Sequence, residues 1–191
     1  LGHDPAPAMR LLILGTAIVP LTALPVFWLV PALGGLAEVA QAALRLTLVI
    51  GLAVAAAFTL RRLLFPDPKP ATVQMLDGLS ALTLAIIVIG LMSAVGPALR
   101  SDPLRLAGWL MLACAVNFGM QALSLMLHRA AGRTKTAVPA SIIAGNRNIA
   151  LFLVALPAPV TDPVLVFIGC YQIPMYLTPI VMQRFYGRDP T

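Results

Sequence analysis

The sequence predicts an all-α polytopic membrane protein with about six transmembrane helices, because it is poor in charge and its charges separate long apolar windows. Hydrophobic residues make up 60% of the chain and charged residues 10%, and the mean hydropathy is +0.93. Soluble domains carry about 25% charged residues because their surface faces water. The windows without Asp, Glu, Lys or Arg are 11–37, 46–60, 78–99, 106–127 and 163–183, together with 136–146 and 148–161, which are separated only by Arg147.

Turn-forming and charged residues between these windows set the ends of the predicted spans. We expect helices at roughly 9–31, 36–62, 73–98, 104–128, 137–157 and 163–186. No linker or low-complexity segment divides the chain, so we expect a single transmembrane domain over residues 1–191. The sequence starts at Leu1 instead of Met, and we interpret it as a fragment that lacks N-terminal spans.

The positions of Lys and Arg favour a topology with both termini on the cytoplasmic side of a bacterial inner membrane. Of the thirteen basic residues, nine then lie on the cytoplasmic side, three on the opposite side and Arg147 in the middle of a span. The cytoplasmic set is Arg10, Arg61, Arg62, Lys69, Arg129, Arg133, Lys135, Arg184 and Arg188. The opposite set is Arg45, Arg100 and Arg105.

The fifth predicted span, 137–157, carries the most informative motif of the chain. Two apolar halves flank Gly145, Asn146, Arg147 and Asn148. Gly and Asn are poor helix formers, and Asn is a good helix N-cap. We therefore predict two half-helices interrupted within 144–148. Transporters use such breaks because half-helix N-termini attract anions and the freed carbonyls coordinate cations.

Arg147 lies about ten residues, or about 15 Å, from each end of this span. An arginine at a helix centre costs about 2.5–3.5 kcal/mol to insert. The acidic residues are all in loops or near span ends: Asp4, Glu38, Asp67, Asp77, Asp102, Asp162 and Asp189. The partner of Arg147 is therefore a set of helix-end carbonyls, a residue outside this sequence or an anionic ligand.

Three further polar residues inside spans are candidates for a substrate or ion site: Asn117, Gln121 and Gln172. Asn117 and Gln121 are four residues apart and share a helix face. Interhelical hydrogen bonding is the simpler interpretation of each residue alone. Ser141 and Tyr176 are also polar residues within spans.

Other classes of protein lack support in the sequence. No phosphate-binding loop, metal-spaced His or Cys cluster or catalytic triad can be assembled at one depth, so we expect neither an enzyme nor a metal site. Cys114 and Cys170 fall inside predicted spans, where a disulfide is not expected. No basic run is interleaved with aromatic residues, so nucleic acid is not an expected partner.

Three segments carry a resemblance to the bile acid:sodium symporter family. Residues 134–151, with Gly145 and Asn148, resemble the crossing helix in the second half of that family, which typically has a Gly-x-Gln-Asn element preceded by a glutamate. Residues 172–179 resemble its last helix and 16–25 its fifth. The resemblance implies that this chain is the fifth to tenth of about ten spans, built as inverted repeats with crossing broken helices.

The sequence departs from this family at its sodium-binding positions. Ile143 stands where the family has its glutamate, and Arg147 stands where it has its glutamine. These changes remove two sodium ligands and add a fixed positive charge, which argues against sodium coupling. We expect a carrier for a small organic anion, in which Gly145, Asn146, Arg147 and Asn148 form half of the site. The alternatives are an auxin-efflux-like carrier and a non-transporting membrane receptor or assembly subunit.

Overall fold

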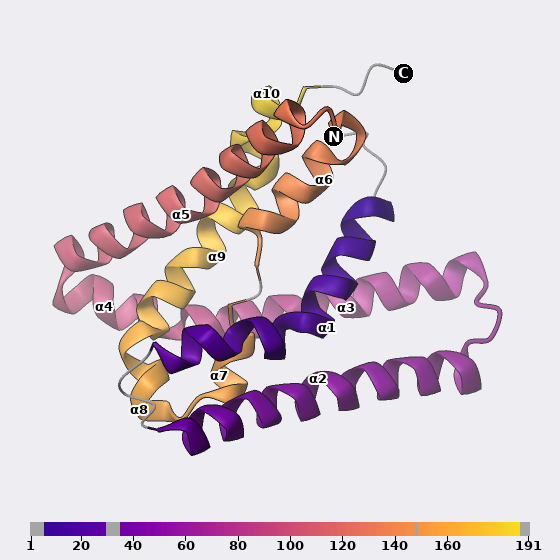
Figure 1. Cartoon of the computed structure of the whole chain (residues 1–191), viewed down its shortest axis with the longest axis horizontal. Coiled ribbons are helices and arrows are strands. Elements are labelled where there is room, and N and C mark those ends of the chain that lie inside the picture. The colour runs from indigo at the N-terminus through magenta and orange to yellow at the C-terminus, as the bar shows by residue number, and fades with distance from the viewer. Residues whose placement is uncertain (1–5, 30–34, 148, 188–191) are drawn as a thin grey trace. The chain divides into compact units, whose positions relative to one another are not determined.

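The computed structural model describes residues 6–29, 35–147 and 149–187, and every element in these ranges is a helix (Figure 1). Five helical segments are long and apolar enough to cross a membrane: Ala6–Trp28, Leu36–Leu64, Pro70–Ser101, Pro103–Ala130 and Ala158–Val181. The chain is therefore an integral membrane protein with an all-α fold. The remaining predicted span, 137–157, contains two shorter helices.

The helices follow the predicted order along the chain. The first three spans contain α1 (Ala6–Trp28), α2 (Leu36–Leu64), α3 (Pro70–Leu91), the 3-10 turn η2 (Met92–Ala94) and α4 (Val95–Ser101). The helices that follow are α5 (Pro103–Ala130), α6 (Thr134–Gly145), α7 (Leu151–Ala155), α8 (Ala158–Thr161), η3 (Asp162–Val164), α9 (Leu165–Val181) and α10 (Gln183–Tyr186).

Two of the predicted spans are interrupted where a single helix was expected. The span predicted at 73–98 contains η2 just before Gly96 and Pro97. Proline has no N–H for the helical ladder and disfavours the α conformation of the residue before it, so this sequence weakens the helix locally. The span predicted at 163–186 ends as α9 at Val181, and the separate turn α10 follows it.

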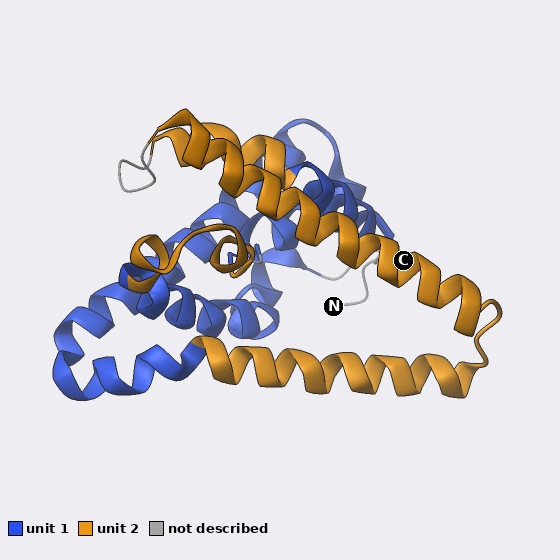
Figure 2. Cartoon of the chain, turned by 90° about the horizontal axis from the view of Figure 1, so that it is seen from below, with its two compact units in different colours: residues 1–18, 92–149, 163–191 blue, residues 19–91, 150–162 orange. Residues whose placement is uncertain are grey.

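The chain divides into two compact units (Figure 2). Unit 1 consists of Leu1–Ile18, Met92–Ile149 and Pro163–Thr191, and unit 2 consists of Val19–Leu91 and Ala150–Asp162. In unit 2, α2 packs against α7 around a small core that includes Phe27 and Leu46. The Phe27 and Phe152 rings meet edge to face with their centroids 5.7 Å apart.

Unit 1 is built on α5, which packs along both α6 and α9. One core cluster includes Leu125, Val138 and Tyr186, and a second includes Ala113 and Tyr171. The first cluster combines residues of α5, α6 and α10, and the second combines residues of α5 and α9. The buried polar residues of unit 1, described below, come from α5, α6 and α9.

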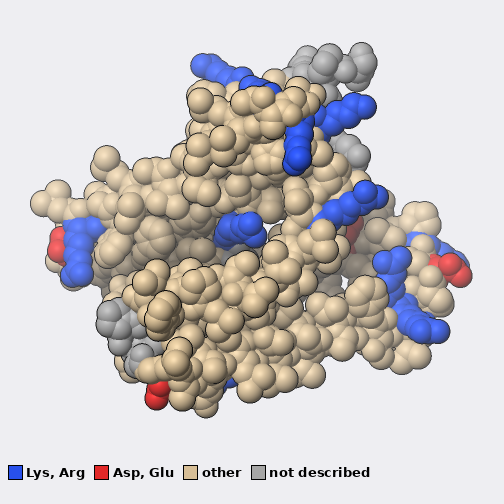
Figure 3. Space-filling model, viewed as in Figure 1, with Lys and Arg blue, Asp and Glu red and all other residues tan. Residues whose placement is uncertain are grey.

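Much of the apolar side-chain area faces outward. No residue of α3 is buried, and Ile86 and Ile89 are 70% and 71% exposed. The face of the molecule in Figure 3 is largely uncharged, with Lys and Arg in separate groups. A surface of this composition suits contact with lipid chains, where apolar residues carry no hydration penalty.

Candidate substrate site at the break in α6

The helix of the fifth predicted span breaks where Gly145 and Asn146 predict it. The last helical bond of α6 runs from the Asn146 N–H to the Ile142 carbonyl, at 2.8 Å. The Arg147 N–H then bonds to the Gly145 carbonyl at 3.0 Å, and the Ile149 N–H to the Arg147 carbonyl at 2.9 Å. The predicted interruption is confirmed. Asn148, the last residue of the motif, lies outside the described residues.

The second half-helix is shorter than predicted. It is α7, a helix of five residues that begins at Leu151 and ends at Ala155. The macrodipole grows from aligned peptide units, and so short a helix adds little to it. The expectation of a strong half-helix N-terminus is therefore corrected, because the helix that follows the break within the span is only five residues long. The electrostatics of the break depend on its side chains.

The carbonyl freed at the break is satisfied by the neighbouring helices. The Gly145 carbonyl accepts hydrogen bonds from Asn117 Nδ2 of α5 at 2.9 Å and from the Tyr171 hydroxyl of α9 at 2.6 Å. A buried carbonyl without a partner is costly, particularly in a membrane. Asn117 and Tyr171 therefore compensate directly for the main-chain bonding that is lost at the break.

The Asn146 side chain is held by the same two helices. Its Oδ1 lies 3.0 Å from Asn117 Nδ2, 3.2 Å from Thr178 Oγ1 and 3.5 Å from Gln121 Nε2. Gln121 Nε2 also donates to Asn117 Oδ1 at 2.6 Å and lies 3.0 Å from Thr178 Oγ1. The first residue after α6 is thus fixed by a network that spans α5 and α9.

The network continues along α6 toward α10. The Ser141 hydroxyl donates to the Gln121 carbonyl at 2.6 Å and lies 3.2 Å from the Tyr186 hydroxyl. The Tyr186 hydroxyl donates to Gln121 Oε1. Asn117, Gln121 and Ser141 are fully buried. These side chains are occupied with one another, so their role is to hold the break in place.

Gly145 is required by the close approach of α5 and α6. A Cβ at this position would lie 2.3 Å from Gln121 Cγ and 2.5 Å from the Asn117 carbonyl oxygen. Real contacts of that length do not occur, and the carbonyl belongs to the α5 backbone and cannot move aside cheaply. The glycine therefore brings the end of α6 within hydrogen-bond reach of Asn117.

Arg147 is the charged group next to this network. Its side chain is exposed, and Nη1 lies 3.0 Å from the position that a Cβ on Gly15 of α1 would take. Within the described ranges, the guanidinium makes no hydrogen bond or ion pair with the protein. The Asn146 amide nitrogen likewise has no partner there, so two hydrogen-bond donors of adjacent residues remain free for a ligand.

The other predicted site residue, Gln172, lies apart from the break. It is buried in α9, and its amide bonds to the Ile168 carbonyl of its own helix at 3.3 Å. It follows Tyr171, and successive helical residues point about 100° apart. Sequence reasoning missed Tyr171, Thr178 and Tyr186. Tyr171 and Thr178 are seven residues apart, which places them on one helix face. This spacing is the feature of the sequence that could have identified them as partners of the break.

The oxygens around the break already accept hydrogen bonds from donors of the protein. The Gly145 carbonyl, Asn146 Oδ1 and Asn117 Oδ1 each accept hydrogen bonds from amide or hydroxyl donors. Arg147 adds a positive charge beside them. In the described part of the chain, no group of three His, Cys, Asp or Glu side chains could hold a metal ion. The free groups of the site are donors, which suit an anion.

Comparisons of this chain with protein-family models, with curated proteins and with solved structures found no match. The fold therefore identifies this chain only as a helical integral membrane protein that has a buried polar network at a helix break.

Replacing Asn117 with Leu is expected to lower the thermal stability of the protein in detergent. The change removes one acceptor of the Gln121 amide and one donor each to the Gly145 carbonyl and to Asn146 Oδ1. A single membrane hydrogen bond is worth about 0.6 kcal/mol, but buried groups left unsatisfied cost about 1–3 kcal/mol. Thr83→Val is the control, because Thr83 is exposed and bonds only to Leu79 of its own helix. Equal melting temperatures for the two variants would contradict the role given to Asn117.

Proposed function

We propose that this chain belongs to a secondary transporter that moves a small organic anion across the membrane. The observation that carries the proposal is the Arg147 guanidinium, which has no partner among the described residues and lies beside a helix break stabilised by a buried polar network. Arg147 supplies the counter-charge for the anion, and the Asn146 amide supplies a second hydrogen bond.

The energetics of the membrane support this role for Arg147. An arginine at membrane depth costs about 2.5–3.5 kcal/mol to insert, and an intramembrane charge of this kind marks a substrate or ion pathway by default. A bound anion offsets that cost in each transport cycle. Broken helices at the site are typical of carriers, because a helix that ends in mid-membrane exposes polar backbone to the substrate.

The resemblance to the bile acid:sodium symporter family supports a particular architecture. We propose that N-terminal spans of the same protein complete an inverted-repeat fold around the break in α6. In that arrangement the guanidinium takes the electrostatic place of a bound cation, with Arg147 instead of a glutamine and Ile143 instead of a glutamate. Transport would then proceed without sodium coupling.

The main alternative from another class is an assembly subunit, in which Arg147 pairs with a carboxylate of another protein. Such a pair requires an unpaired arginine but no interruption of its helix. The side chains that stabilise the break therefore favour the transporter. Anion binding tests the proposal: small carboxylates and sulfonates are titrated into the purified full-length protein, and their effect on its melting temperature is measured. If none of these anions raises the melting temperature, the result would argue for the assembly subunit.

We also propose that both termini face the cytoplasm of a bacterial cell, as the distribution of Lys and Arg indicates. Cysteine labelling in intact cells checks this orientation, after Cys114 and Cys170 are replaced with alanine. A cysteine at Ala158, the first residue of the last candidate span, is expected to react with an impermeant maleimide. A cysteine at Ala131, between Arg129 and Arg133, is expected to react only after the cells are opened. Both positions are exposed, and the reverse pattern would overturn the orientation.

A further inference from the structure

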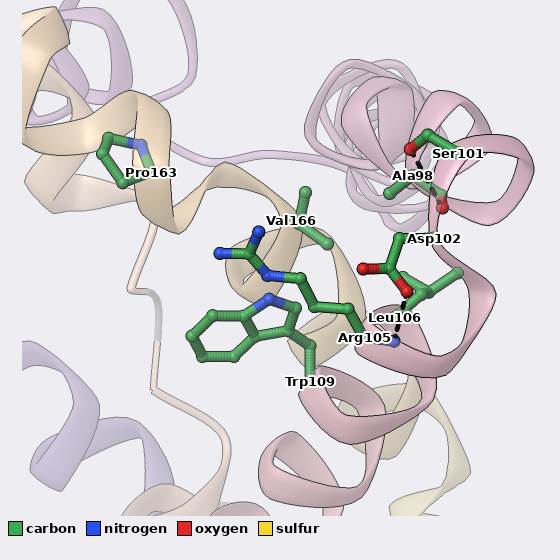
Figure 4. A pocket seen from close by; sticks show the side chains of 8 residues that line it. All are labelled: Ala98, Ser101, Asp102, Arg105, Leu106, Trp109, Pro163 and Val166. Atoms are coloured by element: carbon green, nitrogen blue, oxygen red, sulfur yellow. Dashed lines mark hydrogen bonds between the residues drawn. The ribbon is translucent and has the colours of Figure 1, made fainter.

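A second polar site lies in unit 1, where α4 turns into α5 beside the start of α9 (Figure 4). It is a cavity of about 290 Å³. Its polar lining consists of Ser101, Asp102 and Arg105, and its apolar lining consists of Ala98, Leu106, Trp109, Pro163 and Val166. None of these residues belongs to the network at the break in α6.

The cavity presents one positive and one negative group that do not neutralise each other. Asp102 caps α5, since its Oδ1 accepts the Arg105 main-chain N–H at 3.0 Å, and its second carboxylate oxygen has no partner among the residues that the structure describes. The Arg105 guanidinium extends away from Asp102, alongside Trp109 and toward Val166 (Figure 4). Within the described ranges, this guanidinium has no hydrogen bond or ion pair with the protein.

The apolar residues that line the cavity are held in place by packing against neighbouring side chains. Leu106 is buried and Trp109 is half-buried. The Trp109 ring packs edge to face on Phe167, with the centroids 5.9 Å apart. This packing fixes the indole beside the guanidinium, so the spacing between the charged and apolar groups is set by α5 and α9.

The cavity lies at the end of two candidate spans, Pro70–Ser101 and Pro103–Ala130. Tryptophan gathers at membrane interfaces, where its ring sits at the level of the lipid headgroups, and arginine extends its charge to the same level. Asp102 stands in the connection between the two spans. We therefore expect the cavity at the level of the headgroup layer, where charged lipid groups are concentrated.

We propose that this cavity binds a zwitterion, the phosphoethanolamine headgroup of a membrane lipid. The phosphate pairs with the Arg105 guanidinium, and the ammonium group pairs with the free oxygen of Asp102. A lipid that carries only an anion meets the Asp102 carboxylate without a compensating cation, so it binds more weakly. The proposal is independent of the anion site at Arg147, because no residue is shared between the two.

Native mass spectrometry of the full-length protein tests the site. Delipidated protein is titrated with short-chain phosphatidylethanolamine, with phosphatidylglycerol of the same chain length and with soluble phosphoethanolamine. Phosphatidylethanolamine is expected to bind tightest, and Arg105→Gln or Asp102→Asn should each weaken it by about tenfold or more, since each removes a charge-assisted hydrogen bond. Asn is as good an N-cap as Asp, so Asp102→Asn removes the charge without uncapping α5.

Arg100→Gln is the matched control, because it removes a basic residue of the neighbouring α4 that does not line the cavity. It should leave the affinity for phosphatidylethanolamine unchanged. Equal binding of the two lipids, or affinity that is insensitive to Arg105→Gln and Asp102→Asn, would overturn the proposed site. Soluble phosphoethanolamine binding as tightly as the lipid would overturn the assignment to a lipid headgroup.

Discussion

Arg147→Gln is expected to reduce the affinity of the protein for its small organic anion by about 30-fold to 4,000-fold, because removing one partner of a desolvated charge pair costs about 2–5 kcal/mol. Glutamine keeps a hydrogen-bond donor and much of the side-chain length, so the loss measures the charge. The affinity of Arg147→Lys should lie between those of the unmodified protein and Arg147→Gln, since an ammonium keeps the charge but cannot bind a carboxylate through two parallel N–H groups.

The affinity is measured as the stabilisation of the purified full-length protein by increasing concentrations of the anion. Arg133→Gln is the matched control: Arg133 precedes the first residue of the same helix, is exposed and lies at the opposite end from the break. It should bind the anion as the unmodified protein does. Equal losses in both variants would mean that net charge, and not the position of Arg147, governs binding.

Gly145→Ala is expected to destabilise the protein by at least about 1–3 kcal/mol, the usual cost of overpacking. The added Cβ would lie 2.5 Å from the Asn117 carbonyl oxygen. That oxygen belongs to the α5 backbone, so α6 must move away from α5. The movement lengthens the hydrogen bonds from Asn117 and Tyr171 to the Gly145 carbonyl. Because these bonds are weakened, the melting temperature of the variant should fall.

Gly119→Ala provides the control in the facing helix. Gly119 lies in the middle of α5, is exposed and has no atom within 4 Å of its added Cβ. Alanine is a better helix former than glycine, so this variant should be neutral or more stable by up to about 1 kcal/mol. Equal stability of the two alanine variants would contradict the close approach of α5 and α6 at Gly145.

The long helices were predictable because membrane spans are governed by length and polarity alone. The charge-free windows at 11–37 and 106–127 contain most of α1 and α5. The ends of helices were less predictable, because they depend on local main-chain effects such as the Gly96-Pro97 pair that follows η2. The orientation of the chain and its relation to the bile acid:sodium symporter family stay predictions.

The break in α6 was predictable from Gly145 and Asn146, because both residues are unfavourable within a helix. The partners that stabilise it were only partly predictable. Asn117 and Gln121 are polar residues in an apolar span, which marks them in the sequence. Tyr171 and Tyr186 do not stand out in this way, because tyrosine is common in apolar segments and its hydroxyl gains a role only from packing.

Other features of unit 1 depend on contacts between distant segments. Arg147 approaches Gly15, which lies 132 positions earlier in the chain. The periodicity of a sequence does not predict a contact between such distant residues. Arg105 was interpreted only as a topology signal, since its neighbours Pro163 and Val166 come from a different part of the sequence. Side-chain sites of this kind follow from helix packing, which the pattern of apolar residues constrains only loosely.

Uptake of the anion by proteoliposomes tests most directly the claim that the Arg147 guanidinium acts as the fixed counter-charge of an anion carrier. The full-length protein is assayed in sodium medium and in medium with sodium replaced by choline. Equal uptake in the two media is expected, together with loss of uptake in Arg147→Gln. Strong stimulation of the unmodified protein by sodium, or unchanged uptake by Arg147→Gln, would contradict the account and assign Arg147 a structural role.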